Sequence, residues 1–388
     1  MGTVQGVCNA KFEKLKILLQ DSITSGDELG ASISLNVGGK EEVDIYGGYA
    51  DEGRARPWVK DTIVNVWSST KTVSALAVLI LHDRGLLDVD ENVCKYWPEF
   101  AANGKDQVKV RHLLSHSSGV SGWQEPVTLE DIYDVERAAD KLAQQAPWWE
   151  PGSASGYHSL TMGHLLGELV RRVSGKSLTQ FVADEISGPL GADFQIGAKE
   201  FDWPRISNVI PPTILASDFD PDSIIHKTFY HPPPSAVAMN TAAWRNAELG
   251  AVNGHTNAKA LCTILSAITL GGTVDGYKLL SQKTIDRIFE TQTDGIDHVF
   301  GIPIRFGIGY AIAGGGTEQA IPFIPKGENR RVACWGGWGG SWIVCDLDNR
   351  LTFAYTMNKM RDGVLGSTQT VKYINAVYEI IDSAGEKP

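Results

Sequence analysis

The chain has 388 residues, of which 43% are hydrophobic and 21% charged, and its formal net charge is −11. A chain of this length exceeds one small core, so we expect two packed lobes. The acidic balance, without a cluster of lysines and arginines, argues against nucleic acids and anionic membrane surfaces as partners.

The five cysteines are scattered along the chain and form no Cys-x-x-Cys pair. This pattern predicts free thiols in a reducing compartment rather than a disulfide framework or a zinc ribbon. The first residues contain no apolar signal segment, and no stretch approaches 18 consecutive apolar residues. We therefore expect a cytoplasmic protein that does not interact with membranes.

Hydrophobic spacing predicts the elements at the start of the chain. Leu15, Leu18 and Leu19 lie on one face of a first helix, and strand-like runs follow it. We predict one helix and three strands, in this order: residues 12–25, 31–37, 42–49 and 62–67.

The next helix opens with Ser68-Ser69-Thr70-Lys71, which contains the single Ser-x-x-Lys pattern of the chain. Helical spacing puts Ser68 and Lys71 on one face, with Cβ atoms roughly 5–6 Å apart. A serine hydroxyl becomes a nucleophile when a base takes its proton, and a lysine whose pKa is lowered by burial can be that base. Taken alone, the motif also fits an exposed helix start with Ser68 as N-cap and Lys71 in solvent.

The middle of the chain is predicted to be helical, with helices over residues 128–145 and 162–175. Residues 201–234 are rich in proline, and we interpret them as a long ordered lid loop over a site, the alternative being a structural wrap. The later residues predict four strands and a closing helix, over residues 306–312, 331–335, 342–345, 351–355 and 371–381.

This order of elements predicts a mixed α/β fold of the α+β type. An antiparallel sheet flanked by the N-terminal and C-terminal helices would form a discontinuous α/β lobe from residues 1–75 and 300–388. Residues 76–299 would form a mainly helical lobe that carries the proline-rich loop.

Tyr157 is a candidate partner of Lys71 in proton transfer. It follows a loop of small residues and precedes a helix, a place from which a tyrosine can be presented into a cleft. A nearby ammonium would hold the phenol as phenolate. The alternative is a tyrosine that simply packs at a helix entrance.

The segment Trp335-Gly336-Gly337-Trp338 lies on and after a predicted strand. Glycines in a strand suggest that a ligand approaches the backbone closely. Backbone N–H groups here could bind an oxyanion together with the N–H of Ser68. A glycine-rich bulge between strands is the alternative.

In combination these features resemble the serine β-lactamase and penicillin-binding-protein superfamily, and within it the family VIII carboxylesterases, whose relatives include fungal acyltransferases of statin biosynthesis. The resemblance rests on four ordered motifs: Ser68-x-x-Lys71, the segment 111–119, Tyr157-x-Ser159 and Trp335-Gly336-Gly337. It implies a β-lactamase/transpeptidase-like fold and an acyl-enzyme mechanism without metal or organic cofactor.

The resemblance also implies a role for each site residue. Ser68 would attack an ester carbonyl, while Lys71 and Tyr157 would act together as general base. The N–H groups of Ser68 and Trp338 would form the oxyanion hole.

Two departures from the β-lactamase pattern bear on the substrate. Trp335 stands where β-lactamases usually have lysine, and Ser159 stands where they usually have asparagine. Both favour an apolar or aromatic ester over a β-lactam. The candidate substrate-binding residues are Trp335, Gly336, Gly337, Ser159, Trp123, Tyr230 and His255.

We therefore expect a serine hydrolase that cleaves carboxylic esters of small apolar molecules. An acyltransferase, or a lactone-forming or lactone-opening enzyme of secondary metabolism, would use the same Ser68 and differ in the acceptor. Amidase, β-lactamase and non-catalytic binding roles are kept as further alternatives. His112 and His116 have no third ligand nearby, so no zinc site is predicted. A small-molecule ester is the expected partner, and a homodimer is left open.

Overall fold

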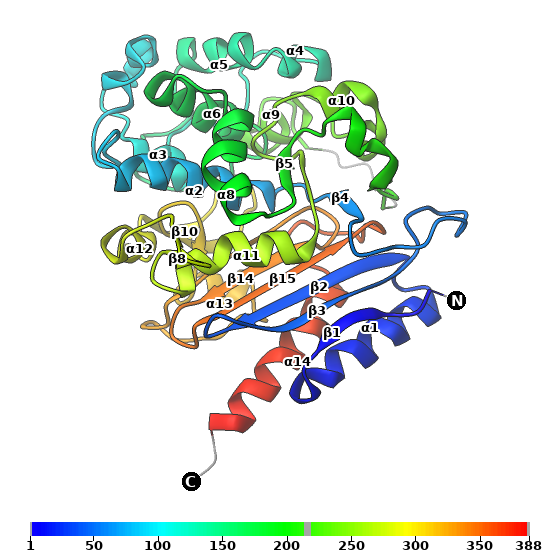
Figure 1. The fold of residues 1–388 in the computed structure, drawn as a ribbon. Coiled ribbons are helices and arrows are strands. Elements are labelled where there is room, and N and C mark those ends of the chain that lie inside the picture. Colours follow the sequence, from blue (N-terminus) through cyan, green and yellow to red (C-terminus); the bar gives the residue numbers. More distant parts are fainter. Residues whose placement is uncertain (1, 213–218, 386–388) are drawn as a thin grey trace.

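The structure, a computed structural model, describes residues 2–212 and 219–385. Its largest feature is a nine-stranded sheet, in which every neighbouring pair is antiparallel (Figure 1). In spatial order the strands are β1 (Gln5–Cys8), β3 (Lys40–Gly48), β2 (Gly30–Val37), β15 (Leu351–Met357), β14 (Trp342–Asp346), β13 (Val332–Gly336), β12 (Ala311–Ile312), β11 (Pro303–Phe306) and β10 (Thr293–Ile296).

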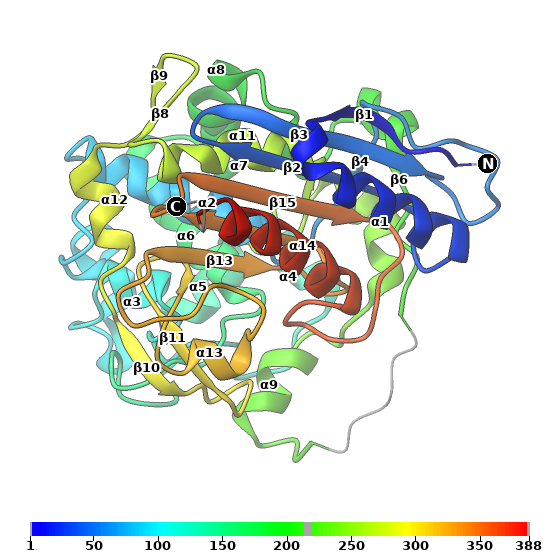
Figure 2. The ribbon, with the colours of Figure 1, turned by 90° about the horizontal axis from the view of Figure 1, so that it is seen from below.

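The two ends of the chain meet at the middle of this sheet. Strand β2 pairs with β15 from Ala31 opposite Met357 to Val37 opposite Leu351. Helices α1 (Glu13–Ser25) and α14 (Thr368–Gly385) pack together on one face, as Figure 2 shows from below, and α11 (Ala258–Thr269) covers the other. Because both faces are covered, the central strands are buried along most of their length. The predicted α+β fold class is confirmed.

Helix α2 (Thr70–Asp83) lies at the centre of the helical region above the sheet (Figure 1). Every residue from Thr70 to Leu81 is buried, and the part of the helix from Ala75 to Leu81 is apolar on all sides, as is typical of a buried helix. Helix α6 (Thr161–Ser174) packs along it. The other helices are α3 (Val110–Leu114), α4 (Leu129–Tyr133), α5 (Val135–Gln144), α7 (Leu178–Val182), α8 (Gly188–Leu190), α9 (Ile224–Tyr230), α10 (Ala242–Asn246), α12 (Gln282–Ile288) and α13 (Thr317–Ala320).

A second, small sheet connects the two regions and leads the chain into α2. Its strand order is β5 (Phe194–Ile196), β7 (Gly254–Thr256), β4 (Ile63–Asn65) and β6 (Ile206–Ser207). A separate hairpin joins β8 (Thr273–Val274) to β9 (Tyr277–Lys278). Strand β4 is the predicted strand before Ser68, and it is held between β7 and β6.

Two predicted elements are divided in the structure. The helix predicted over residues 128–145 is α4 and α5, because Asp134 leaves the helical conformation at ψ 83° and its side chain accepts from the N–H of Arg137 to cap α5. The strand predicted over residues 306–312 is β11 and β12, separated by a turn in which Gly309 has φ 91°. A single helix and a single strand were wrong at these places.

The large sheet takes up parts of the middle of the chain. Strand β10 extends its edge, and α11 packs on β2, β14 and β15. The predicted helical lobe, residues 76–299, includes β10 and α11. These two elements contact the large sheet, which was predicted to belong to the other lobe. The division into two lobes stays a prediction.

The proline-rich stretch 201–234 contains β6 and α9, and it begins within a short 3-10 helix (Glu200–Arg205). Residues 213–218 of the predicted loop lie outside the described residues. Across the described ranges, each helix is too short or too polar to cross a bilayer.

Candidate active site

Ser68 lies at the turn that joins β4 to α2. Trp67, just before it, has a left-handed backbone with φ 49°, which is uncommon for a large side chain. The N–H of Trp67 donates to Asn65 Oδ1 at 3.1 Å, and the N–H of Thr70 donates to Trp67 O at 2.9 Å. The turn is therefore held by its own hydrogen bonds and presents Ser68 at the first turn of a buried helix.

Lys71 is buried beside Ser68, with 1% of its surface exposed. Its Nζ lies 2.9 Å from Ser68 Oγ, 2.7 Å from Ser159 O and 3.1 Å from Ala251 O. No carboxylate of the described residues pairs with it, and burial lowers the pKa of Lys71 well below its ordinary value. The Ser-x-x-Lys spacing has thus produced a buried contact rather than the exposed helix start that was the alternative.

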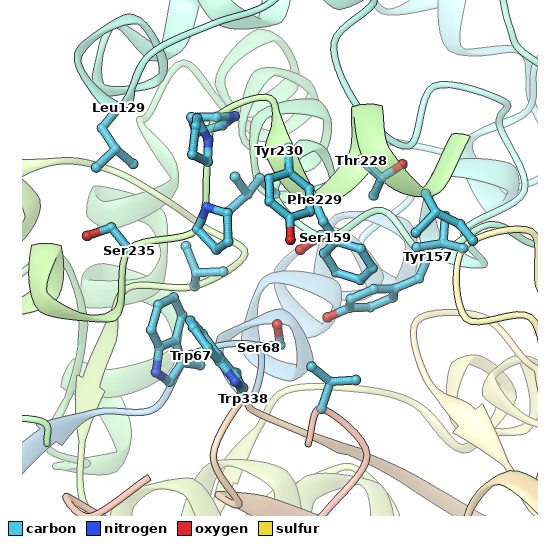
Figure 3. A pocket seen from close by; sticks show the side chains of 18 of the residues that line it. Trp67, Ser68, Leu129, Tyr157, Ser159, Thr228, Phe229, Tyr230, Ser235 and Trp338 are labelled. Carbon is cyan, nitrogen blue, oxygen red and sulfur yellow. The ribbon is translucent and has the colours of Figure 1, made fainter. Parts of the chain in front are cut away.

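The Tyr157 hydroxyl points toward the same serine (Figure 3). Its oxygen accepts from Trp335 Nε1 at 3.4 Å, and the Ser68 side chain lies near enough to act on its pKa. Its ring stacks on Phe300, with centroids 4.7 Å apart and planes at 23°. Burial raises the pKa of Tyr157 above its ordinary value, and the hydrogen bonds from Ser68 and Trp335 only partly oppose this effect.

The connection from β13 to β14 passes directly beside the Ser68 turn. Ser341 Oγ donates to Val66 O at 2.8 Å, and a Cβ at Gly337 would lie 2.3 Å from that same carbonyl oxygen. Gly337 therefore permits close approach of the protein's own backbone. The sequence suggested that these glycines let a ligand approach the backbone. At Gly337 the close approach is instead that of another segment of the same chain.

Two backbone donors remain unused at this point of the site. The N–H groups of Ser68 and Trp338 donate to no acceptor within residues 2–212 and 219–385. Trp338 stands next to Trp67 beside Ser68, with ring centroids 4.9 Å apart (Figure 3). Their free N–H groups are compatible with the oxyanion hole that the sequence predicts.

A cavity of about 400 Å³ opens above Ser68. No charged side chain of the described residues lines it. One wall is formed by Phe219 and by α9 with the prolines that follow, so the described end of the predicted proline-rich loop does border the site. The aromatic and proline residues that line it are Trp67, Trp244, Trp338, Tyr157, Phe219, Phe229, Tyr230, Phe300 and residues 232–234.

Among the predicted substrate-binding residues, Ser159 and Tyr230 line this cavity. Trp335 lies behind Tyr157, and Gly336 is buried in β13 opposite Trp342. Gly337 is occupied by the contact with Val66 described above.

Trp123 and His255 do not line the cavity in the described part of the chain. Trp123 is a core residue whose Nε1 donates to Ala138 O at 3.0 Å, and its ring packs edge-on against His164. His255 is fully buried in β7 between β4 and β5. Both were proposed from residue type and nearby motifs, which do not indicate the direction of a side chain.

Several residues that line the cavity were not predicted from the sequence, among them Trp67, Phe229, Trp244 and Phe300. Trp67 carried a usable signal, since it directly precedes the predicted nucleophile, and Phe229 lies in the predicted proline-rich loop 201–234. Trp244 and Phe300 come from segments without a motif, and the fold brings them to Ser68.

The two histidines considered as metal ligands have other partners. His112 Nδ1 accepts from the N–H of Lys109 at 3.2 Å, and His116 Nδ1 accepts from the N–H of His158 at 3.0 Å. A search of residues 2–212 and 219–385 for groups of three or more metal-ligating side chains finds none.

Residues 16–373 match the family model described as Beta-lactamase. The chain belongs to the beta-lactamase family. The Mycobacterium tuberculosis protein named Esterase/beta-lactamase LipL is 31% identical over 344 residues, which cover 85% of this chain and 77% of that relative.

Two solved structures place this beta-lactamase-family member more closely. A structure titled family VIII carboxylesterase is 36% identical, covers 97% of this chain and 99% of its own, and has a TM-score of 0.89. Simvastatin synthase LovD from Aspergillus terreus covers 98% of this chain and 100% of its own at a TM-score of 0.70 and 18% identity, which shows the shared fold. The resemblance to the superfamily and its esterase branch is confirmed, and that to the fungal acyltransferase holds at the level of the fold.

Proposed function

We propose that the protein is an enzyme, a serine hydrolase that cleaves carboxylic esters of small apolar molecules through an acyl-enzyme on Ser68. The observation that carries this proposal is the position of Ser68 Oγ, 2.9 Å from the buried Lys71 amine at the base of a cavity that no charged side chain of the described residues lines. The relatives named esterase and carboxylesterase support the same activity.

The surroundings of Lys71 suit a neutral base. A neutral amine has two hydrogens and one lone pair, and the carbonyl oxygens of Ser159 and Ala251 can accept the two hydrogens. The lone pair is then left for the hydroxyl proton of Ser68, 2.9 Å away. Because burial lowers the pKa of Lys71, the amine is free of its extra proton at lower pH than an exposed lysine would be.

In acylation, Ser68 Oγ bonds to the ester carbonyl carbon while its proton moves to Lys71 Nζ. The N–H groups of Ser68 and Trp338 stabilise the negative charge that develops on the carbonyl oxygen, a contribution worth about 2.7–4 kcal/mol for one donor. The carbon–oxygen bond to the alcohol then breaks, the leaving oxygen takes the hydroxyl proton of Tyr157, and Lys71 returns its proton to Tyr157. Water reverses these steps to release the acid.

Tyr157 acts in this scheme as a neutral phenol. The phenolate expected from sequence needs a pKa lowered by an ammonium, whereas burial raises the pKa of Tyr157 and lowers that of Lys71. Both directions favour the uncharged pair. We therefore assign the base to Lys71 and the donation to the leaving group to Tyr157.

The cavity walls favour uncharged substrates. A carboxylate on the substrate would need a cationic partner, and the position where β-lactamases usually carry lysine holds Trp335, whose Nε1 donates to Tyr157. An apolar wall instead binds alkyl and aryl groups by removing them from water. This supports esters over β-lactams, whose carboxylate would find no partner here.

A matched pair of substrates tests the proposal. The kcat/KM for p-nitrophenyl valerate is compared with that for p-nitrophenyl hemisuccinate, which carries a carboxylate at the end of a similar acyl chain. We expect the neutral ester to react at least about tenfold faster, the factor that 1.4 kcal/mol gives. Equal or faster hydrolysis of the charged ester contradicts the assigned substrate class.

Acyl transfer is the second candidate function, and the apolar walls are the observation that favours it. An apolar alcohol can occupy the cavity beside the acyl-enzyme and compete with water for the acyl group. The ratio of new ester to free acid, measured with rising concentrations of butanol, separates the two functions. A new ester that outweighs the acid at millimolar alcohol supports transfer, and acid alone supports hydrolysis.

We also propose a cytoplasmic location, which the five cysteines support because none of them forms a disulfide. A small-molecule ester is the proposed partner. The homodimer stays a prediction.

A further inference from the structure

Asp297 is a fully buried carboxylate in the loop between β10 and β11. Its Oδ1 accepts three backbone N–H groups: that of Tyr157 at 3.1 Å and those of Val299 and Phe300 at 2.9 Å each. Its Oδ2 is buried and has no hydrogen-bond partner in the described part of the chain. The carboxylate is thus held by the protein backbone without a cation.

Two of these three N–H groups belong to Tyr157, the proposed proton donor, and to its neighbour Phe300. The ring of Phe300 stacks on the Tyr157 ring. Val299 and Phe300 also line the cavity. One oxygen atom therefore fixes the backbone of the tyrosine and the position of the ring that packs on it.

A second side chain fixes the next peptide group. His116 Nδ1 accepts the N–H of His158, and the His116 ring lies 4.9 Å from the Tyr157 ring. Burial lowers the pKa of His116 well below its ordinary value, so its Nδ1 stays an acceptor. The backbone at Tyr157 is consequently held through its own N–H and through that of His158. The Tyr157 ring packs against the rings of Phe300 and His116.

We propose that Asp297 is a positioning residue for Tyr157. The Asp297 carboxylate holds the backbones of Tyr157 and Phe300 together, so that the tyrosine hydroxyl stays near Ser68. This inference rests on the proposed function for its kinetic consequence, while the placement of the hydroxyl can be tested without any substrate. Misplacement of a catalytic group by about 1 Å can reduce the rate about 10²-fold.

A double-mutant cycle with a p-nitrophenyl ester tests the kinetic consequence. Asp297→Ala is expected to lower kcat about 10²-fold in the wild-type background and to have no further effect in a Tyr157→Phe background. Asp297→Asn keeps an oxygen acceptor for the three N–H groups, so its kcat should stay within about tenfold of wild type. The proposal would be overturned if the double variant lost kcat by the product of the two single losses. It would also be overturned if Asp297→Asn were as slow as Asp297→Ala.

Asp83→Ala is the matched control. Asp83 likewise accepts a backbone N–H, that of Ser281, together with hydroxyl groups, but it lies at the far end of α2. At 1.5 Å per residue it stands roughly 20 Å from Ser68. This variant should lose stability while its kcat responds to Tyr157→Phe as wild type does. If Asp297→Ala does not fold, Asp297→Ser replaces it, since a serine hydroxyl can accept the N–H of Val299 locally but is too short to reach Tyr157.

Crystal structures of the variants give the readout that is independent of the substrate. In Asp297→Ala the Tyr157 hydroxyl should move away from Ser68 relative to its position in the wild type, and in Asp297→Asn and Asp83→Ala it should keep its wild-type position. An unmoved hydroxyl in Asp297→Ala contradicts the inference even if every ester is cleaved. A displaced hydroxyl supports it even if no ester is cleaved, in which case only the proposed function fails.

Discussion

The amine of Lys71 is surrounded by two carbonyl oxygens and one hydroxyl, and no carboxylate of the described residues compensates a positive charge on it. A lysine in such a place loses its extra proton easily, which is the property that a general base for Ser68 needs. Tyr157, buried against Phe300 and Trp335, keeps its proton for the same reason, because burial disfavours the charged form of either side chain. The two residues therefore carry distinct parts of the proposed proton transfer.

Replacing either residue should slow turnover at unchanged fold. We expect Lys71→Ala and Tyr157→Phe each to lower kcat by about 10²–10⁴-fold, the usual contribution of a general acid or base. Steady-state hydrolysis of p-nitrophenyl butyrate, with circular dichroism to verify folding, measures the loss. A variant with a near-normal rate removes its residue from the mechanism.

The pH dependence should follow from the same burial. Lys71 acts in its deprotonated form, so kcat/KM should rise with pH as the amine loses its proton and then level off. Because the pKa of Lys71 lies well below 10.5, the plateau should be reached well below pH 10.5. A profile that still rises steeply at pH 10 would indicate an ordinary, solvated lysine.

Ser68, Lys71 and Tyr157 could be predicted from the sequence because each belongs to a short local pattern or to a motif of the family. Ser68 and Lys71 are one helical turn apart, a relation that any helix preserves. Asp297 could not be predicted, since its role depends on a hydrogen bond to Tyr157, 140 positions away in the chain. Trp123 was proposed as a cavity wall because of its residue type. Contacts with distant residues place it in the core instead.

At the scale of elements, the contact between the β13–β14 connection and the turn after β4 decides where the oxyanion donors stand. Ser341 joins the two segments through Val66 O and through Ser69 Oγ at 3.0 Å, and Gly337 leaves no room for a side chain between them. The sequence indicated that these glycines matter but assigned the close approach to a ligand. The pairing of two distant segments explains it instead.

A methyl group at Gly337 should therefore disrupt the site from within. The added Cβ of Gly337→Ala would meet Val66 O at 2.3 Å, Ser341 Oγ at 2.4 Å and Trp67 Cβ at 3.0 Å, so the connection must move away from Ser68. We expect a loss of kcat of at least about 10²-fold, as for one oxyanion donor. Gly363→Ala is a poor control because its φ is 108°, whereas Gly295→Ala, in open space on β10, should leave the rate unchanged.

Across the whole molecule, the N-terminal and C-terminal segments form one packed unit around the β2–β15 pair. The sequence predicted the strands at both ends, because their apolar runs are local, but not their spatial order. It also assigned α11 and β10 to the helical region, since nothing in a short amphipathic run indicates which surface it will cover. Strand order and helix docking are decided by contacts between distant residues.

Glu28 makes this unit sensitive to pH. It is buried between α1 and β2 and accepts the hydroxyl groups of Tyr355 on β15 and Tyr373 on α14. Burial raises the pKa of Glu28 from 4.5 to about 7, with the tyrosine hydrogen bonds opposing the shift. The folded state thus binds more protons than the unfolded state between these values, so this group's stabilisation is complete below pH 4.5 and is lost as pH rises through 7.

Glu28→Gln should remove this dependence, because the amide is neutral at every pH and its oxygen can accept the same hydroxyl groups. Relative to wild type, the variant's free energy of unfolding should gain up to about 3 kcal/mol between pH 4.5 and pH 8. Urea denaturation at the two pH values measures the difference. A gap between variant and wild type that does not change with pH would contradict a raised pKa at Glu28.

The central claim is that Ser68 is the nucleophile of an acyl-enzyme, and intact-protein mass spectrometry tests it most directly. The wild type and Ser68→Ala are mixed with a fluorophosphonate and with p-nitrophenyl acetate. We expect one covalent adduct on the wild type, mapped to Ser68, and none on the folded variant. No adduct on a folded wild type, or an equal adduct on Ser68→Ala, would contradict it.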